Sequence, residues 1–258
     1  MLTFENLVEG FRELGVKEGD TLLVHSSYKS LGEVDGGPQT VIRALETALG
    51  TDKDGTLIMP TFNFDFNKGV PWDVRKTRSK MGALTEVVRT DPRAKRVFHP
   101  FYSFAVLGKH AETLGSLRYK SSYERNSVFG KLRDMDGKIM VIGLSYNDSM
   151  TFFHHIEQME GVNYRFLKQF TGEVTDENGN TYTDTFEMLV RDIDKGVRTM
   201  VDPMGALMEQ AGIVKIRKIG EADVKLMKAN EVYAFTAREM KRDPHLLYYI
   251  DKSQAEVH

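Results

Sequence analysis

The sequence contains no cysteine among its 258 residues, which excludes disulfide bonds, thiolate metal sites and a cysteine acyl-enzyme. It also lacks an excess of charge of either sign, because 35 basic residues face 37 acidic ones and the net charge is -2. Such a balance offers no global field to nucleic acid or to an anionic membrane surface. No apolar run approaches the length of a membrane span, and the start of the chain carries no basic region followed by an apolar segment. We therefore expect a soluble, cytoplasmic protein that binds neither nucleic acid nor membrane.

The first sixty residues have the apolar pattern of a helix followed by a strand, a helix and a second strand. The first helix is predicted over residues 4–14, where apolar residues recur with helical spacing. Residues 21–26 form a short apolar strand, Pro38 opens the next helix, and residues 56–60 form the second strand. A strand, a helix and a strand in this order are typical of a right-handed crossover in a parallel or mixed sheet.

The rest of the chain adds an aromatic loop and a hairpin. The loop at residues 61–80 is too long for a simple connector, and its aromatic side chains indicate a packed wall. Asn178 and Gly179 carry the signal of a type I′ hairpin, so an antiparallel ribbon is expected to join the sheet. Further helices are predicted at 81–89, 127–134, 207–211 and 232–240, and further strands at 102–107, 138–143 and 213–219. The prediction is one α/β domain over residues 1–258, with a mixed central sheet flanked by helices and an antiparallel hairpin extension.

The most informative polar pair lies between Thr151 and Glu157. His154 and Glu157 stand three residues apart on a predicted helix, and such positions share one face. A glutamate that holds one imidazole nitrogen leaves the other free to take a proton near neutral pH. The pair also follows the predicted strand 138–143, and catalytic groups often lie past the carboxyl ends of such strands. An isolated H-x-x-E is nevertheless usually a surface ion pair. Other segments of the sequence are therefore needed to distinguish a catalytic pair from a surface ion pair.

Metal binding by His154, His155 and Glu157 is a weaker alternative. Adjacent histidines point about 100° apart on a helix, so both are poorly placed for one ion. The sequence has neither H-E-x-x-H nor a cysteine framework. We therefore expect no metal.

Two further segments place polar residues near strand ends. Residues 25–37 join a predicted strand to a helix, where free backbone N–H groups and the helix dipole suit a phosphate, although a polar loop with turn glycines is an equal alternative. This loop matches neither a P-loop nor G-x-G-x-x-G.

The second segment covers residues 99–105. Its Ser103 lacks the G-x-S-x-G elbow of a serine nucleophile, and a role as hydrogen-bond donor to a bound carbonyl fits this serine better. His99 is equally well explained as a capped loop residue before proline.

Five blocks occur in a fixed order along the chain. They are V-H-S-S-x-K-S-L-G-x-V-x-G-G at 24–37, G-T-L-I-M-P-T-F at 55–62, S-K-M-G-A-L-T-E-x-x-R at 79–89, H-P-x-x-S-F-A at 99–105 and T-F-F-H-H-I-E at 151–157. Together they resemble the aminoglycoside 3-N-acetyltransferase family, acetyl-CoA-dependent enzymes whose fold is distinct from that of the GNAT acetyltransferases. The resemblance extends from the first helix to about Arg165 and returns weakly in the hairpin and C-terminal part.

The resemblance implies roles for individual residues. His154 would be the general base, Glu157 would orient it, and His155 occupies a position that is usually apolar. Acetyl-CoA would be the co-substrate. The residues that the resemblance implies beside this co-substrate are Ser26, Ser27, Leu31, Gly32, Val34, Met81, Gly82, Ser103, Phe104 and Ala105.

The implied acceptor is the 3-amino group of an aminoglycoside, entering from the aromatic loop, and the implied role is antibiotic resistance. Because aminoglycosides are polycations, acidic residues are expected around the acceptor cleft. The candidates are Asp65, Asp73, Asp148 and Glu160. The sequence departs from the family pattern at Met150, where the family often has asparagine, and at Val128, where it has proline. These departures leave the acceptor open.

Other functions stay compatible with the sequence. The amine could belong to another amino sugar or small molecule. A hydrolase in which the same histidine activates water is a second class, although no nucleophile elbow or metal motif supports it. A non-catalytic ligand-binding relative is a third, against which the intact His154 and Glu157 pair argues. A homo-oligomer is compatible with all three.

Overall fold

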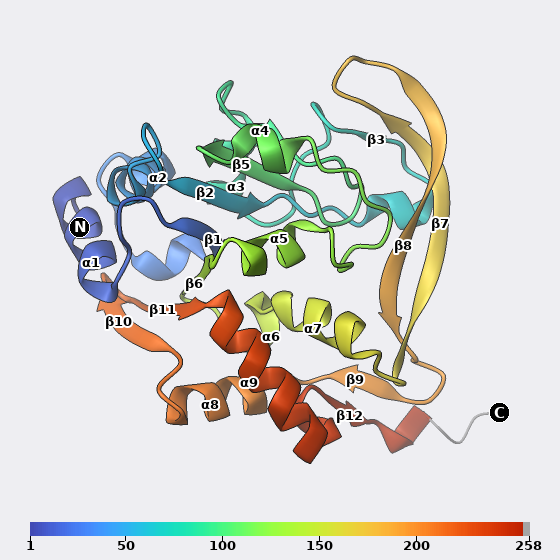
Figure 1. Cartoon of the computed structure of the whole chain (residues 1–258). Helices are drawn as coiled ribbons and strands as arrows, with labels where there is room; N and C mark the ends of the chain where they lie inside the picture. Colours follow the sequence, from blue (N-terminus) through green and yellow to red (C-terminus); the bar gives the residue numbers. More distant parts are fainter. Residues whose placement is uncertain (255–258) are drawn as a thin grey trace.

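A seven-stranded mixed sheet forms the centre of the protein in the computed structural model, which describes residues 1–254 (Figure 1). In spatial order its strands are β10 (Lys215–Ile219), β11 (Ala222–Lys228), β6 (Lys138–Ile142), β1 (Thr21–Ser26), β2 (Thr56–Pro60), β5 (Phe104–Gly108) and β4 (Lys95–Arg96). The three central strands β6, β1 and β2 run parallel, and the outer strands pair in the antiparallel sense. The expected mixed α/β fold is therefore confirmed.

Helices bury both faces of this sheet, which explains why its central strands are continuously apolar. Leu22 and Val24 of β1 pack in one hydrophobic cluster, and Leu23 between them packs in the other. The first cluster receives side chains from α1 (Phe4–Leu14), α2 (Gly37–Leu49) and α3 (Ala83–Arg89). The second receives them from α4 (Ala111–Gly115), α5 (Val128–Asp134), α7 (Phe152–Glu160), α8 (Asp202–Gln210) and α9 (Ala229–Arg242). No helix within residues 1–254 is long and apolar enough to span a membrane.

Most of the predicted elements are confirmed. The first helix and the strands β1 and β2 have the predicted bounds, and α2 connects those two parallel strands as a crossover. The aromatic loop is a packed wall, because Phe62, Phe66 and Trp72 are buried in it. It contains a 3-10 helix η2 (Asp65–Lys68) and a short strand β3 (Trp72–Asp73). Five strands were not predicted, namely β3, β4, β9 (Val197–Thr199), β11 and β12 (Tyr248–Ile250).

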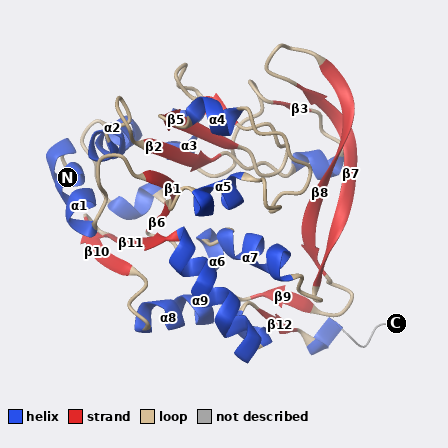
Figure 2. Ribbon diagram, viewed as in Figure 1, coloured by secondary structure: helices blue, strands red, loops and turns tan. Residues whose placement is uncertain are grey.

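The hairpin differs from the prediction in its turn and in its position. Strands β7 (Arg165–Thr175) and β8 (Thr181–Arg191) pair over their full length and leave a five-residue loop, not a two-residue turn. The Asp176 carboxylate accepts the backbone N–H groups of Asn178 and Asn180, both at 2.9 Å, and this builds the wider loop. The hairpin pairs with β3 in a separate three-stranded sheet and does not join the central one, as Figure 2 shows along one side of the molecule.

Candidate active site

The predicted contact between His154 and Glu157 is present. A short helix α6 (Tyr146–Ser149) follows β6, and α7 begins directly after Thr151. Both side chains lie on one face of α7, and His154 Nδ1 is 2.5 Å from Glu157 Oε2. Helix α7 ends at Gly161, whose φ of 66° reverses the chain toward β7.

Two residues that the sequence did not reveal also hold the Glu157 carboxylate. The Tyr164 hydroxyl donates to Oε1 at 2.8 Å, and Arg165 Nε forms an ion pair with Oε2 at 2.8 Å. The carboxylate is fully buried, so these three partners replace its water shell. Tyr164 and Arg165 follow the turn at Gly161, and neither the H-x-x-E spacing nor any local pattern marks them in the sequence.

The electrostatics of the pair select one tautomer. Burial alone raises the Glu157 pKa, but His154, Arg165 and the Tyr164 hydroxyl together lower it below its ordinary value. Burial, and then the Arg165 charge, lower the His154 pKa, although Glu157 partly opposes them. The imidazole is therefore neutral near pH 7, and its Nδ1–H donates to the ionised Glu157. Nε2 is left with a lone pair that can accept a proton.

His154 lines a cleft of about 830 Å³ beside the β7–β8 hairpin. Its side chain keeps 17% of its surface exposed. Tyr102 and Tyr123 form the aromatic side of the cleft, and the Tyr123 ring meets the His154 ring edge-on at a centroid distance of 5.5 Å. The volume is in the range of small-molecule sites.

Two buried histidines position these tyrosines. His99 Nδ1 accepts the backbone N–H groups of Phe101 and Tyr102, at 3.2 and 3.1 Å, so the capping interpretation of His99 is confirmed. His155 Nδ1–H donates to the Tyr123 carbonyl at 2.7 Å. Burial lowers the pKa of His99 to about 3 and that of His155 to about 4, so both are neutral hydrogen-bonding groups.

The predicted co-substrate residues lie away from this cleft. Of the predicted site residues, His154 alone lines it in the described part of the chain. Leu31, Val34, Phe104 and Ala105 are buried in the two hydrophobic clusters, whereas Ser26, Ser27, Gly32, Met81 and Gly82 keep some exposure. The loop that carries Ser26 nevertheless starts beside α7, because His25 Nε2 lies 3.5 Å from Thr151 Oγ1.

Ser103 belongs to a buried network around Arg96. Its hydroxyl donates to the Thr61 carbonyl at 2.9 Å and accepts Arg96 Nη2 at 3.1 Å. Arg96 also donates to the carbonyls of Val74 and Thr77, at 3.0 and 2.6 Å. Burial lowers the Arg96 pKa to about 9. The network joins the aromatic loop to β4 and β5.

The acids expected around the acceptor do not line this cleft. Asp65, Asp73 and Glu160 pair with lysines elsewhere, and Asp148 accepts the Ser145 hydroxyl at 2.7 Å. The charged residues that do line the cleft are Arg165, Lys168, Arg191 and Asp194. In the described residues the cleft wall is therefore mainly basic.

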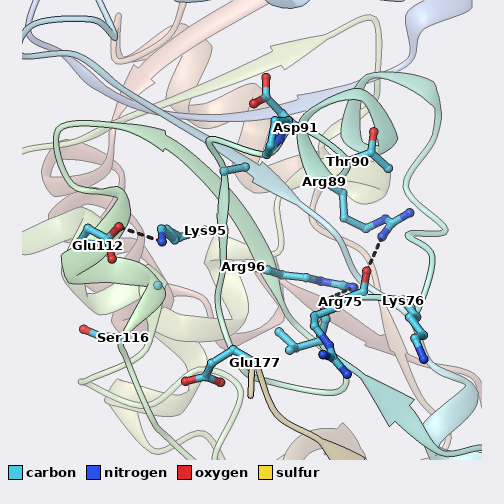
Figure 3. Close-up of a pocket in the computed structure, with 14 residues that line it drawn as sticks. Arg75, Lys76, Arg89, Thr90, Asp91, Lys95, Arg96, Glu112, Ser116 and Glu177 are labelled. Atoms are coloured by element: carbon cyan, nitrogen blue, oxygen red, sulfur yellow. Dashed lines mark hydrogen bonds and ion pairs between the residues drawn. The ribbon is translucent and has the colours of Figure 1, made fainter. Parts of the chain in front are cut away.

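A second cleft of about 810 Å³ lies near β4 and contains none of the predicted site residues described above (Figure 3). Its basic side chains are mostly engaged by neighbouring groups. Lys95 pairs with Glu112 at 2.9 Å, and Arg89 pairs with Glu86 and donates to the Arg75 carbonyl. These cations serve the structure of the cleft wall.

Comparison with known proteins identifies the family. The sequence profile of the aminoglycoside 3-N-acetyltransferases matches residues 23–241. The aminoglycoside N(3′)-acetyltransferase-like protein YokD of Bacillus subtilis is 27% identical, over 92% of this chain and 91% of its own. Aminoglycoside N(3)-acetyltransferase IX of Micromonospora chalcea is also 27% identical, over 91% of this chain and 92% of its own.

Solved structures share the fold. Aminoglycoside acetyltransferase AAC(3)-Xa superposes with a TM-score of 0.83 at 24% identity, covering 93% of each chain. AAC-IIIb in a binary complex with CoASH superposes with a TM-score of 0.83 at 23% identity, over 93% of this chain and 96% of its own. A mutant of AAC(3)-IVa in complex with a gentamicin superposes with a TM-score of 0.82 at 24% identity, over 99% of this chain and 94% of its own. The chain belongs to the aminoglycoside 3-N-acetyltransferase family, and it is an acyltransferase.

Proposed function

We propose that the protein is an acetyl-CoA-dependent N-acetyltransferase in which His154 is the general base and Glu157 its orienting partner. The observation that carries this proposal is the buried hydrogen bond between Glu157 and His154 Nδ1 at 2.5 Å, which leaves Nε2 toward the cleft. A neutral, oriented imidazole is the group that amine acylation requires. The relatives named as N-acetyltransferases support the reaction class.

The mechanism needs no covalent enzyme intermediate. An ammonium group is not nucleophilic, so the acceptor first gives one proton to solvent and reacts as the free amine. His154 Nε2 then takes a second proton from the amine nitrogen as this nitrogen attacks the thioester carbonyl. Glu157 stabilises the imidazolium that forms. Collapse of the tetrahedral intermediate breaks the C–S bond, and the proton passes to the departing thiolate, giving an amide and free CoA. A positioned base of this kind contributes about 10²- to 10⁴-fold to the rate.

The co-substrate is proposed to lie along the loop that follows β1. The resemblance implies Ser26, Ser27 and Gly32 there, and in the described chain no side chain caps the first turn of α2, whose N–H groups suit a phosphate. Aromatic contacts run from this region toward the base: Phe62 packs on Tyr102 and Tyr102 on Tyr123, both at 4.8 Å between ring centroids. The solved relative with CoASH supports this co-substrate.

The acceptor is proposed to be an amine on a small molecule that fills the cleft beside His154. The names of the relatives make the 3-amino group of an aminoglycoside the first acceptor to test, with a role in antibiotic resistance. A solved relative in complex with a gentamicin supports the same class. Another amino sugar or small-molecule amine is the alternative.

Replacing His154 with alanine tests the base. Free-thiol release from acetyl-CoA in the presence of an amine should fall by at least about 100-fold, because no other group in the described cleft takes the proton at this position. CoA binding, followed by calorimetry, should persist. His245→Gln is the matched control, since this histidine is exposed and lies outside the cleft. Substantial turnover by His154→Ala would refute the assignment, and thiol release without any amine would indicate the hydrolase.

A further inference from the structure

The Glu157 carboxylate has two partners besides the imidazole, and both are supported by the small sheet of β9 and β12. This sheet lies beside the end of α7 and the lower end of the hairpin in Figure 1. The ring of Tyr248 on β12 stacks on the ring of Tyr164, with 3.8 Å between the centroids and 22° between the planes. The hydroxyl of Thr199 on β9 accepts Arg165 Nη2 at 2.9 Å. Each partner of the carboxylate therefore has a contact with this sheet.

The two supporting residues belong to one cross-strand pair. Tyr248 and Thr199 face each other in the antiparallel register of β12 and β9. Tyr248 is only 8% exposed, and it packs with Tyr164 and Val197 in a hydrophobic cluster separate from the two that cover the central sheet. Side chains on paired strands are held more precisely than side chains on loops. The pair is therefore a fixed support for the groups that it contacts.

We infer that the Tyr248 and Thr199 pair positions the Glu157 carboxylate for the proposed reaction. Tyr248 acts by fixing the direction of the Tyr164 hydroxyl, and Thr199 acts by fixing the guanidinium of Arg165. The inference rests on the proposed N-acetyltransferase function, in which this carboxylate orients the general base. Both contacts to the carboxylate measure 2.8 Å. A displacement of about 1 Å away from the carboxylate would take either one past the usual range of a hydrogen bond.

Tyr248→Leu tests the stacking contact. Leucine keeps an apolar side chain but removes the ring, so kcat for thiol release from acetyl-CoA, with gentamicin or glucosamine as the amine, should fall by about three- to tenfold, the effect of weakening one hydrogen bond. Tyr248→Phe keeps the ring and should restore kcat. Tyr249→Leu is the matched control, because Tyr249 is the next residue on the same strand and is 44% exposed. Unchanged kcat in Tyr248→Leu overturns the role of Tyr248.

The Tyr164→Phe background separates positioning from a purely structural role. If Tyr248 acts through the Tyr164 hydroxyl, Tyr248→Leu should lower kcat by less than about twofold once that hydroxyl is absent. It should still lower the stability to urea in this background, because the ring at position 164 remains. An equal loss of kcat in both backgrounds would show a purely structural role and overturn the inference for Tyr248.

Thr199 is tested by removing and restoring its hydroxyl. Thr199→Val keeps the shape but removes the acceptor of Arg165, so kcat should fall by about three- to tenfold. Thr199→Ser keeps the hydroxyl and should restore kcat. Thr199 also lines the cleft, so a higher KM for the amine at unchanged kcat would assign it to substrate binding and overturn its positioning role. Unchanged kcat and KM overturn it as well.

Failure of the proposed function is distinguishable from failure of this inference. If His154→Ala keeps its turnover, or if no amine is acetylated, the proposed function fails. The pKa of the Glu157 carboxyl, followed by carbon NMR, then decides the positioning role. Burial raises this pKa, and the Tyr164 hydroxyl is one of the groups that lower it. Tyr248→Leu should therefore raise the pKa as Tyr164→Phe does, and an unchanged pKa overturns the inference.

Discussion

Replacing Glu157 with glutamine tests how the buried carboxylate acts on His154. Oε2 of this carboxylate is 2.5 Å from His154 Nδ1 and 2.8 Å from Arg165 Nε, while Oε1 accepts the Tyr164 hydroxyl. Glutamine has nearly the same shape but carries no charge, and its amide nitrogen cannot accept any of these donors. The substitution therefore removes the counterion of two groups and misdirects at least one hydrogen bond.

The expected losses follow from these contacts. In the proposed mechanism, the imidazolium that forms on His154 loses a charged hydrogen bond of about 1.5–3 kcal/mol, which lowers kcat by about 10- to 150-fold. Arg165, whose side chain is only 4% exposed, loses its carboxylate partner. Breaking a buried pair in this way typically costs about 3–5 kcal/mol of unfolding free energy. The variant should therefore be slower and less stable at the same time.

The pH profile separates an electrostatic role from a loss of structure. His154 must be neutral to accept a proton, so kcat rises with pH through the His154 pKa, which lies below its ordinary value. Glu157 raises this pKa, and its loss should move the acid limb of the profile to lower pH. Steady-state thiol release across pH, with urea unfolding of each variant, measures both effects.

Tyr164→Phe is the matched control because it removes one donor to Glu157 and keeps the charge. Its kcat should stay within about tenfold of the wild type, the effect of one hydrogen bond to a charged group. The reasoning is refuted if folded Glu157→Gln keeps kcat within about threefold of the wild type, or if its acid limb moves to higher pH.

Two other predictions concern stability. Burial lowers the pKa of three histidines besides His154, namely His25, His99 and His155. The unfolded state therefore binds more protons below about pH 6.5, and urea titrations should show the unfolding free energy falling toward pH 4 by about 1.4 kcal/mol per pH unit for each of the three. Ser103→Ala should lower the unfolding free energy by about 1–3 kcal/mol with kcat within about threefold, because it removes an acceptor of Arg96; a loss of about 100-fold in kcat at unchanged stability would instead make Ser103 an oxyanion donor.

The sequence was sufficient for the parts of the fold that depend on local patterns. Helix α1 and the strands β1 and β2 follow from apolar spacing and from the turn residues at their ends. β11 was not predicted, although its apolar and charged residues alternate as in a half-buried strand. Its place beside β6 depends on a strand far away in the chain. The hairpin turn was predicted too tight, because the Asn178 and Gly179 signal was outweighed by the Asp176 side chain.

The site likewise combines contacts that local spacing predicts with contacts that depend on the tertiary structure. The spacing of His154 and Glu157 is local, so a helix face predicts their contact. Arg165 reaches Glu157 because the chain reverses at Gly161, and no local pattern contains that information. Resemblance to a family carries over the proposed catalytic pair, whereas the charge of the cleft wall depends on the tertiary structure. The acids expected from the family's substrate are absent from the described cleft wall, and cations stand there instead. The composition of this wall makes the acceptor, not the chemistry, the part of the function that has to be read from the structure.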